Sequence, residues 1–135
     1  MNLPTTMRPV KLMTLLLSAT LLFSCKKDKD NNDTPSSFPK EVNIEYKVTA
    51  TAGNLTKADV TYTNETGGIS SVDNSALPFS KKLKKTVNKY EVLAISTTSS
   101  LPGGLKAEIL IDNKVVKTET YTGNTIVHGI FTYQF

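Results

Sequence analysis

Cysteine, histidine and tryptophan are nearly missing from this chain of 135 residues, which has one Cys, one His and no Trp. With a single cysteine, no disulfide can form within the chain, so the fold must depend on a hydrophobic core alone. With a single histidine, His128, a zinc site would have to take carboxylates for all its other ligands. We therefore interpret His128 as a structural residue, and we predict a protein that is not an enzyme and holds no metal or other cofactor.

Acidic residues are missing from the first 24 positions, which instead contain two basic residues and a short apolar run. Arg8 and Lys11 precede the run at residues 12–23, and its 12 residues are too few for a membrane-spanning helix, which needs about 20. A basic start followed by an apolar run of this length is typical of a secretion signal. We predict that residues 1–24 are a signal peptide that is removed on export.

The lone cysteine follows this run directly, in the segment Leu22-Phe23-Ser24-Cys25. The segment resembles a bacterial lipobox, which has an aliphatic residue at −3 and a small residue at −1; Phe23 is bulkier than usual at −2. The resemblance implies that Cys25 is the first residue of the mature protein and carries acyl chains, such as palmitate, that anchor it in a membrane. An ordinary cleaved signal with a chance cysteine is the alternative.

Residues 25–39 follow the signal and are rich in Asp, Asn, Ser, Thr and Pro. Such a composition predicts a disordered tether. Within it, Lys27-Asp28-Lys29-Asp30 resembles the charged start of Bacteroidota lipoproteins that are bound for the outer face of the cell. The resemblance implies an outer-membrane lipoprotein at the cell surface, and attachment at the periplasmic face is the alternative.

From residue 40 onward, apolar and polar residues alternate, as in a β-strand with one buried face. In residues 42–50 the alternation places Val42, Ile44, Tyr46 and Val48 on the buried side. Turn residues separate about seven or eight such segments, and none has helical periodicity. The segments are 42–50, 58–63, 69–72, 77–80, 90–96, 105–111, 115–121 and 126–135. We predict an all-β domain over residues 40–135, an antiparallel immunoglobulin-like β-sandwich.

Two of these segments have a predictable place in the sheets. Pro78 cannot donate a backbone hydrogen bond, so residues 77–80 should lie at a sheet edge or at a crossing between sheets. Residues 90–96 have apolar side chains on both faces, which favours a central strand.

Several short motifs occur in a recognisable order: Tyr46-Lys47-Val48-Thr49, Val60-Thr61-Tyr62-Thr63-Asn64, Leu77-Pro78-Phe79-Ser80-Lys81, Ile109-Leu110-Ile111-Asp112-Asn113-Lys114-Val115-Val116, and Gly123. Residues 44–129 thereby resemble the small mycobacterial membrane protein (MmpS) family of transport accessory proteins. The resemblance implies an extracytoplasmic β-sandwich that assists large lipid exporters. The chain departs from that family at Phe79 (usually Trp), at Asn113 (usually Gly), and at Ala107 and Gly129, which take the places of paired cysteines. A lipid anchor would also replace the membrane helix of that family.

A lysine-rich segment is the strongest charge feature of the predicted domain. Without residues 1–24 the chain has 14 basic and 12 acidic residues, and this excess of +2 argues against a nucleic-acid partner. The lysines either protect a sheet edge from pairing or form a patch for an anionic lipid, a glycan or an envelope protein. The candidate binding surface comprises Leu77, Phe79, Lys81, Lys82, Lys84, Lys85 and Lys89.

The carboxylates show no catalytic pair. Glu45, Glu91 and Glu108 are predicted to point outward from strands, and Asp73 and Asp112 fall in predicted turns, so no two should converge. We expect a non-enzymatic binding or transport-accessory module of the cell envelope. The alternative is a structural component that pairs with a partner through an exposed sheet edge.

Overall fold

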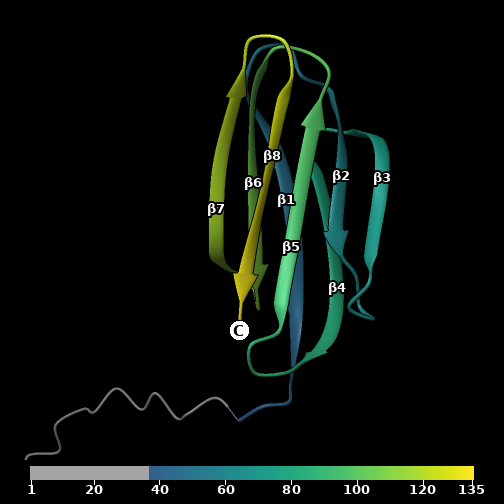
Figure 1. The fold of residues 1–135 in the computed structure, drawn as a ribbon, viewed down its shortest axis with the longest axis vertical. Coiled ribbons are helices and arrows are strands. Elements are labelled where there is room, and N and C mark those ends of the chain that lie inside the picture. Colours follow the sequence, from purple (N-terminus) through teal and green to yellow (C-terminus); the bar gives the residue numbers. More distant parts are fainter. Residues whose placement is uncertain (1–36) are drawn as a thin grey trace, which may run out of the picture. The chain divides into compact units, whose positions relative to one another are not determined.

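The computed structural model describes residues 37–135, which form eight β-strands and no helix (Figure 1). The predicted signal peptide, Cys25 and most of the predicted tether lie outside the described residues. In the part that is described, no helical segment is long and apolar enough to cross a membrane. The strands are β1 (Lys40–Ala52), β2 (Lys57–Thr63), β3 (Ile69–Ala76), β4 (Phe79–Val87), β5 (Val92–Ser99), β6 (Gly103–Ile111), β7 (Lys114–Gly123) and β8 (Val127–Gln134).

The strands form two antiparallel sheets of four strands each, which pack face to face (Figure 1). Sheet A has the order β4-β1-β6-β7, and sheet B has the order β3-β2-β5-β8. The pairings β1–β4 and β2–β5 join strands that are not consecutive, as in the Greek-key connections of immunoglobulin-like sandwiches. The β6–β7 hairpin extends sheet A on the other side of β1. The predicted all-β sandwich is confirmed.

The hydrophobic core lies between the two sheets and follows from the alternation along each strand. In β1, Val42, Ile44, Tyr46 and Val48 are at most 2% exposed, as the sequence pattern predicts. They pack with inward side chains of the other strands, among them Val60, Leu93, Ile95, Leu105, Ile109 and Val127. Each aliphatic side chain removed from water in this way contributes about 1.5–3 kcal/mol.

A hydrogen bond through the core joins the two sheets. Tyr46, fully buried in β1, donates its hydroxyl proton to the carbonyl oxygen of Thr63 in β2 over 2.9 Å. Its ring packs against Tyr62, with the ring centroids 5.2 Å apart. Burial raises the pKa of Tyr46 well above its ordinary value, so the hydroxyl keeps the proton that it donates.

Two strands differ from the sequence prediction. Residues 79–87 form the single strand β4, although only residues 77–80 were predicted as strand, and β3 continues to Ala76 beyond the predicted residue 72. Both are edge strands with few apolar residues, so the alternation that marks a half-buried strand is weak in them. Pro78 lies where the chain crosses from sheet B to sheet A, and β5 lies between β2 and β8. Both of these placements agree with the prediction.

Candidate interaction surfaces

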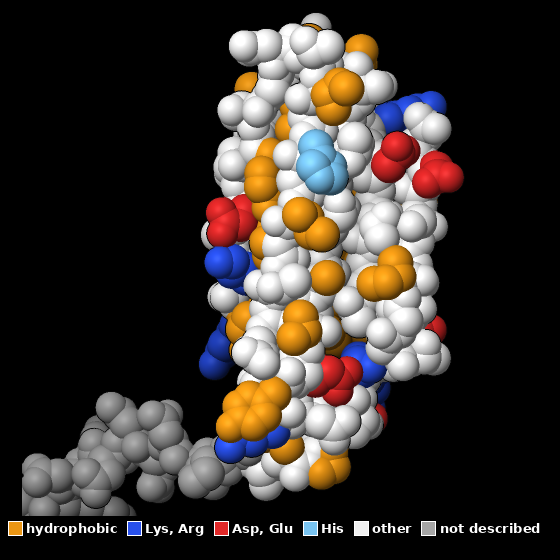
Figure 2. Space-filling view, in the orientation of Figure 1, with side chains coloured by type: hydrophobic (Ala, Val, Ile, Leu, Met, Phe, Trp, Pro, Cys, Tyr) orange, Lys and Arg blue, Asp and Glu red, His pale blue; other side chains and the backbone are white. Residues whose placement is uncertain are grey.

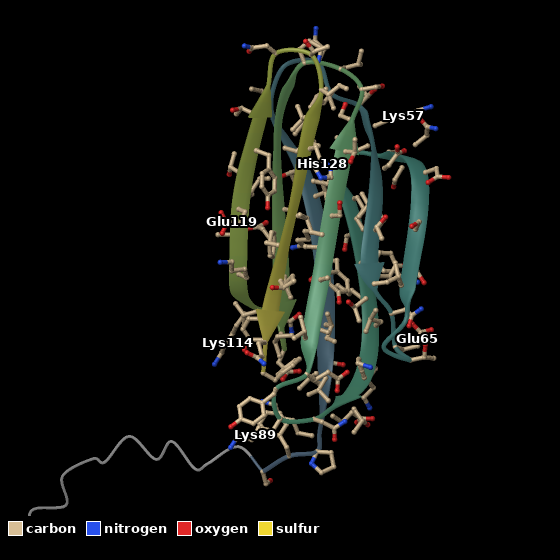
Figure 3. All side chains as sticks on the ribbon, viewed as in Figure 1. Lys57, Glu65, Lys89, Lys114, Glu119 and His128 are labelled. Atoms are coloured by element: carbon tan, nitrogen blue, oxygen red, sulfur yellow. The ribbon has the colours of Figure 1, made fainter. Side chains whose placement is uncertain are left out.

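No three His, Cys, Asp or Glu side chains of residues 37–135 gather in one place. His128 lies on the outer face of β8, exposed to solvent, with Nδ1 2.8 Å from the hydroxyl of Thr98 (Figure 3). Its neighbours on β8 and β5 are uncharged. His128 is thus an exposed residue with one hydrogen-bonded partner, the hydroxyl of Thr98.

The two apolar members of the predicted Leu77–Lys89 binding surface belong to the core rather than to the surface. Phe79 is 9% exposed, and its ring lies 6.2 Å from that of Tyr62. Leu77 is half-buried and packs against the same core. Phe79 is therefore withdrawn from the surface, whereas Leu77 keeps part of its side chain exposed.

The lysines of this segment do not form one patch, because successive residues of β4 point to opposite faces of sheet A. Lys82 and Lys84 point outward and lie 3.9 Å and 2.7 Å from glutamates of β1. Lys81 is exposed at the inner side of the edge, opposite Tyr46. Lys89 follows the strand, with its ammonium 4.8 Å from the ring centroid of Tyr90.

Lys85 is the exception among these lysines, because its side chain is only 5% exposed. Its ammonium lies 2.9 Å from Glu91 Oε1 and donates to the carbonyl oxygen of Glu65 over 3.1 Å. Glu91 was predicted to point outward from a strand, but it lies in the loop before β5. There it also accepts the backbone N–H of Asn88, and this hydrogen bond, together with Lys85, lowers its pKa. Sequence reasoning missed the role of Lys85 because its two partners, Glu65 and Glu91, come from different loops.

The outer face of sheet A is covered by charges that pair with one another. Glu45 is the most buried of them: its side chain is 11% exposed, accepts the hydroxyl proton of Ser80 over 2.8 Å, and lies 3.6 Å from Lys47. Lys106 and Glu108 pair in the same way at 3.2 Å. The outward directions predicted for Glu45 and Glu108 are confirmed. A shallow pocket of about 320 Å³ beside these charges is lined by Asn43, Ile44, Glu45, Lys82, Leu83 and Asn113.

Asp112 confirms the predicted turn chemistry. It lies in the β6–β7 turn, and Oδ1 accepts both the backbone N–H and the side-chain amide of Asn43 over 3.0 Å. These two hydrogen bonds hold the pKa of the Asp112 carboxyl below its ordinary value. The carboxylate therefore fastens the turn to β1.

The outer face of sheet B is different in kind over β5 and β8, where no charged side chain lies, whereas Lys57 and Asp59 of β2 place charges at one corner of the same face (Figure 2). Over the middle of β5 and β8, Figure 2 shows only uncharged side chains beside the single histidine. Ile130 in β8 is 61% exposed and pairs with Ser96, and Ile69 in β3 is 62% exposed. The remaining side chains of this face include Thr61, Ser71, Val92, Ala94, Thr98 and Thr132.

The sequence carries a signal for this face that becomes readable only with the strand register. Every second residue of β5 and β8 is an uncharged Ser, Thr, Ala, Val, Ile or Gln, apart from His128, whereas the outward residues of β1 include Glu and Lys. No candidate binding residue was predicted here, because the apolar residues on both faces of residues 90–96 were interpreted only as the sign of a central strand.

The four sheet edges are protected to different degrees. β4 carries Lys81 and Lys85 on its inner side, a known device against strand pairing. β7 and β8 lie side by side (Figure 1), and a Cβ on Gly129 of β8 would come 2.1 Å from the ring of Tyr121 of β7. β3 contains no lysine and no proline, so it is the least protected edge.

Comparison with models of known protein families gives a match. The model of a family described as Mycobacterium membrane protein matches residues 13–133, which include all of β1 to β7 and most of β8. No curated protein sequence matches the chain.

Proposed function

The chain belongs to the Mycobacterium membrane protein family, and from this premise we propose that it is a non-enzymatic accessory module of the cell envelope. The match agrees with the resemblance of residues 44–129 to the small mycobacterial membrane proteins, whose role is to assist large lipid exporters. We propose a membrane transport protein as the partner.

The anchor is part of the same proposal. Cys25 would carry the lipid, and residues 25–39 would link it to the sandwich, at the outer membrane. The composition of the tether and the lone cysteine after the apolar run support this arrangement. A family of membrane proteins also agrees with attachment to a membrane, by whatever means.

The difference between the two outer faces supports a docking surface on sheet B, and this observation carries the proposal. Cores of protein interfaces are depleted of charge, since each charge removed from water without a partner costs free energy. On sheet A a partner would have to displace ion pairs such as Lys84–Glu41 and the Glu45 cluster. On sheet B a partner would cover Ile130, Ile69 and hydroxyl groups. Removing a hydroxyl from water costs less free energy than removing a charge.

The exposed lysines of the predicted binding surface rank below sheet B for this purpose. Lys82 and Lys84 already have glutamate partners, so an anionic lipid or a glycan would compete with the protein's own carboxylates. Lys81 remains exposed, but the other lysine on the inner side of this edge, Lys85, is buried, so the two form no joint patch. These residues fit a solvated, pairing-resistant edge better than a binding patch.

A structural role through edge pairing is the second candidate, and the unprotected edge of β3 favours it. A partner strand could extend sheet B there by backbone hydrogen bonds. Val72, in the middle of β3 and 36% exposed, faces the inner side. Val72→Lys would place a lysine on the inner side of β3, as Lys81 and Lys85 are placed in β4. A lysine there opposes strand pairing, so the variant should abolish edge pairing and leave docking on the outer face intact.

Site-specific photo-crosslinking in the native cell tests the docking face. A photoreactive residue at Thr132, exposed on sheet B, should give one discrete adduct with a membrane transport protein. The same residue at Thr118, exposed on the outer side of sheet A, is the matched control and should give none. Adducts at Thr118 alone would contradict the proposed surface.

A further inference from the structure

Aromatic rings and lysines gather at one end of the sandwich, the end where the described chain starts. Phe38 and Phe135 meet edge to face with their centroids 6.4 Å apart, and Tyr133 adds a second such contact with Phe135 at 5.2 Å. The Lys40 ammonium lies 5.2 Å from the Phe38 centroid and 5.6 Å from that of Phe135. Hence these residues form a single cationic and aromatic cluster.

The loop between β4 and β5 adds an exposed ring to this cluster and holds it in a fixed position. Tyr90 is 65% exposed, and its backbone has a φ of 69°, which non-glycine residues seldom adopt. Its N–H donates to the carbonyl oxygen of Phe135 over 3.0 Å, and its carbonyl accepts from Gln134 over 3.1 Å. Phe135 N–H also donates to the carbonyl oxygen of Glu91, so two backbone hydrogen bonds and one from the Gln134 side chain hold the loop that presents this ring to solvent.

Most of the charged side chains at this end that make no ion pair are lysines. Lys40, Lys89 and Lys114 make no ion pair among residues 37–135, and Figure 3 shows Lys89 and Lys114 at this end with Glu65. The other acid without an ion pair here, Asp112, is held by Asn43.

The opposite end of the sandwich has Lys57 but no such aromatic cluster. Its connecting segments are 53–56, 77–78, 100–102 and 124–126, and they contain no charged and no aromatic residue. The two ends are therefore chemically distinct, and only the end beside residue 37 has aromatic rings together with free ammonium groups.

The aromatic end is also the one that the proposed anchor would hold near a membrane. Eleven residues lie between Cys25 and residue 37, and if they are the flexible tether that their composition predicts, the end-to-end distance is about 20 Å, or at most about 40 Å when extended. A bilayer at that distance would meet this end at a high effective concentration.

We propose that this end of the sandwich rests on the surface of a bilayer that contains anionic phospholipids, an inference that rests on the proposed anchoring through Cys25. The rings of Tyr90, Phe38 and Phe135 lie at the headgroup level, where aromatic side chains are favoured. The ammonium groups of Lys89 and Lys114 contact lipid phosphates. The contact fixes the orientation of the domain and leaves the outer face of sheet B turned sideways, open to a neighbouring membrane protein.

The absence of tryptophan from the chain makes a direct test possible, because one introduced Trp is the only indole signal. Tyr90→Trp places the reporter at the aromatic end, and Leu101→Trp, at a position 55% exposed, places it at the opposite end. The full-length lipoprotein is reconstituted in phosphatidylglycerol–phosphatidylethanolamine vesicles with brominated acyl chains. We expect the Tyr90→Trp emission to be quenched at least threefold more than the Leu101→Trp emission. Equal quenching at the two ends would overturn the contact.

Charge reversal and flotation separate this inference from the anchor. Lys89→Glu combined with Lys114→Glu should reduce the Tyr90→Trp quenching to the Leu101→Trp level, whereas Lys57→Glu at the other end should not. Quenching that the double reversal leaves unchanged would overturn the role of the lysines. Flotation of the wild type without quenching at Tyr90→Trp would overturn the contact and leave the anchor standing. Failure of the wild type to float, with no acyl mass on its N-terminal peptide, would overturn both.

Discussion

The ammonium of Lys85 lies 2.9 Å from Glu91 Oε1 where an edge strand of one sheet meets the connecting loops of the other. Lys85 also donates to the carbonyl oxygen of Glu65 in the β2–β3 turn, so it ties together two loops and a strand. The side chains are 5% and 21% exposed, which removes most of the lysine charge from water. A lysine of the basic segment is therefore a structural residue of the sandwich.

Removal of the Lys85 charge should destabilise the fold. Lys85→Met leaves Glu91 and the Glu65 carbonyl without their shared donor, and a hydrogen bond to a charged group contributes about 1.5–3 kcal/mol. We expect the free energy of unfolding, measured with urea by far-UV circular dichroism, to fall by about that amount. Lys84→Met is the control, because its pair with Glu41 is exposed at both side chains, and it should cost less than about 1 kcal/mol. Equal costs for the two variants would contradict the structural role of Lys85.

The stability should decrease in acid partly through Glu91. Its pKa in the folded state is lowered from 4.5, first by the Asn88 backbone N–H and then by Lys85. Because the folded pKa is the lower one, the stabilisation is fully present above the unfolded pKa and is lost as pH falls through the folded pKa. The difference in unfolding free energy between wild type and Glu91→Gln should shrink as the pH falls from the unfolded pKa of Glu91 to its folded pKa. Urea unfolding at a series of pH values measures this difference. A difference that stays constant with pH would contradict this assignment.

The sequence predicted the fold well because the strong alternation in β1, β2, β6 and β8 is itself the cause of the sandwich. It predicted less of β3 and β4, where the side chains are mostly polar and the pattern is weak. A sheet edge was one of the two alternatives for the lysine segment; β4 is an edge strand, and the lysines separate to its two faces and a loop. That separation depends on the pairing of β4 with β1, which a single strand does not encode.

The surfaces were harder to predict, because each is assembled from distant segments. The uncharged face needs the register of β2, β5 and β8, and the aromatic end joins residues 38, 90 and 135. Ala107 and Gly129 were identified as the places of the family's cysteines, and both are buried here. The structure shows what fills the space at Gly129: the ring of Tyr121.

The contact of Gly129 with Tyr121 gives a prediction for the side of the sandwich where β7 and β8 lie next to each other. Gly129→Ala would push a methyl group into the Tyr121 ring, and overpacking of this kind costs about 1–3 kcal/mol. The loss should be smaller when Tyr121→Ala is already present, which a double-mutant cycle measures. Additive losses would show that the two residues do not touch.

The hydroxyl of Tyr121 provides a separate prediction. It is buried and finds no hydrogen-bond partner among the described residues, and burial raises its pKa. Tyr121→Phe removes a polar group that gains nothing in the fold, so the unfolding free energy should stay within about 0.5 kcal/mol or rise. A clear loss of stability would mean that the hydroxyl has a partner in solution.

The lipid anchor predicts where the protein goes in the cell. Wild-type protein should fractionate with membranes, and Cys25→Ala should be released, because one cysteine carries all the proposed acyl chains. Protease treatment of intact cells then distinguishes the cell surface from the periplasmic face. If Cys25→Ala fractionates as the wild type does, the protein is not anchored through this residue.

The uncharged outer face of β5 and β8 is the proposed docking surface, and one pair of variants tests it. Ile130→Lys places a charge in the middle of that face, and Thr118→Lys places the same charge on sheet A; both positions are exposed, so neither should unfold the domain. The measurement is the yield of the membrane transport protein that co-purifies with each variant after crosslinking in cells. We predict a loss of at least tenfold for Ile130→Lys and no loss for Thr118→Lys. Full recovery of the partner with Ile130→Lys would contradict the account.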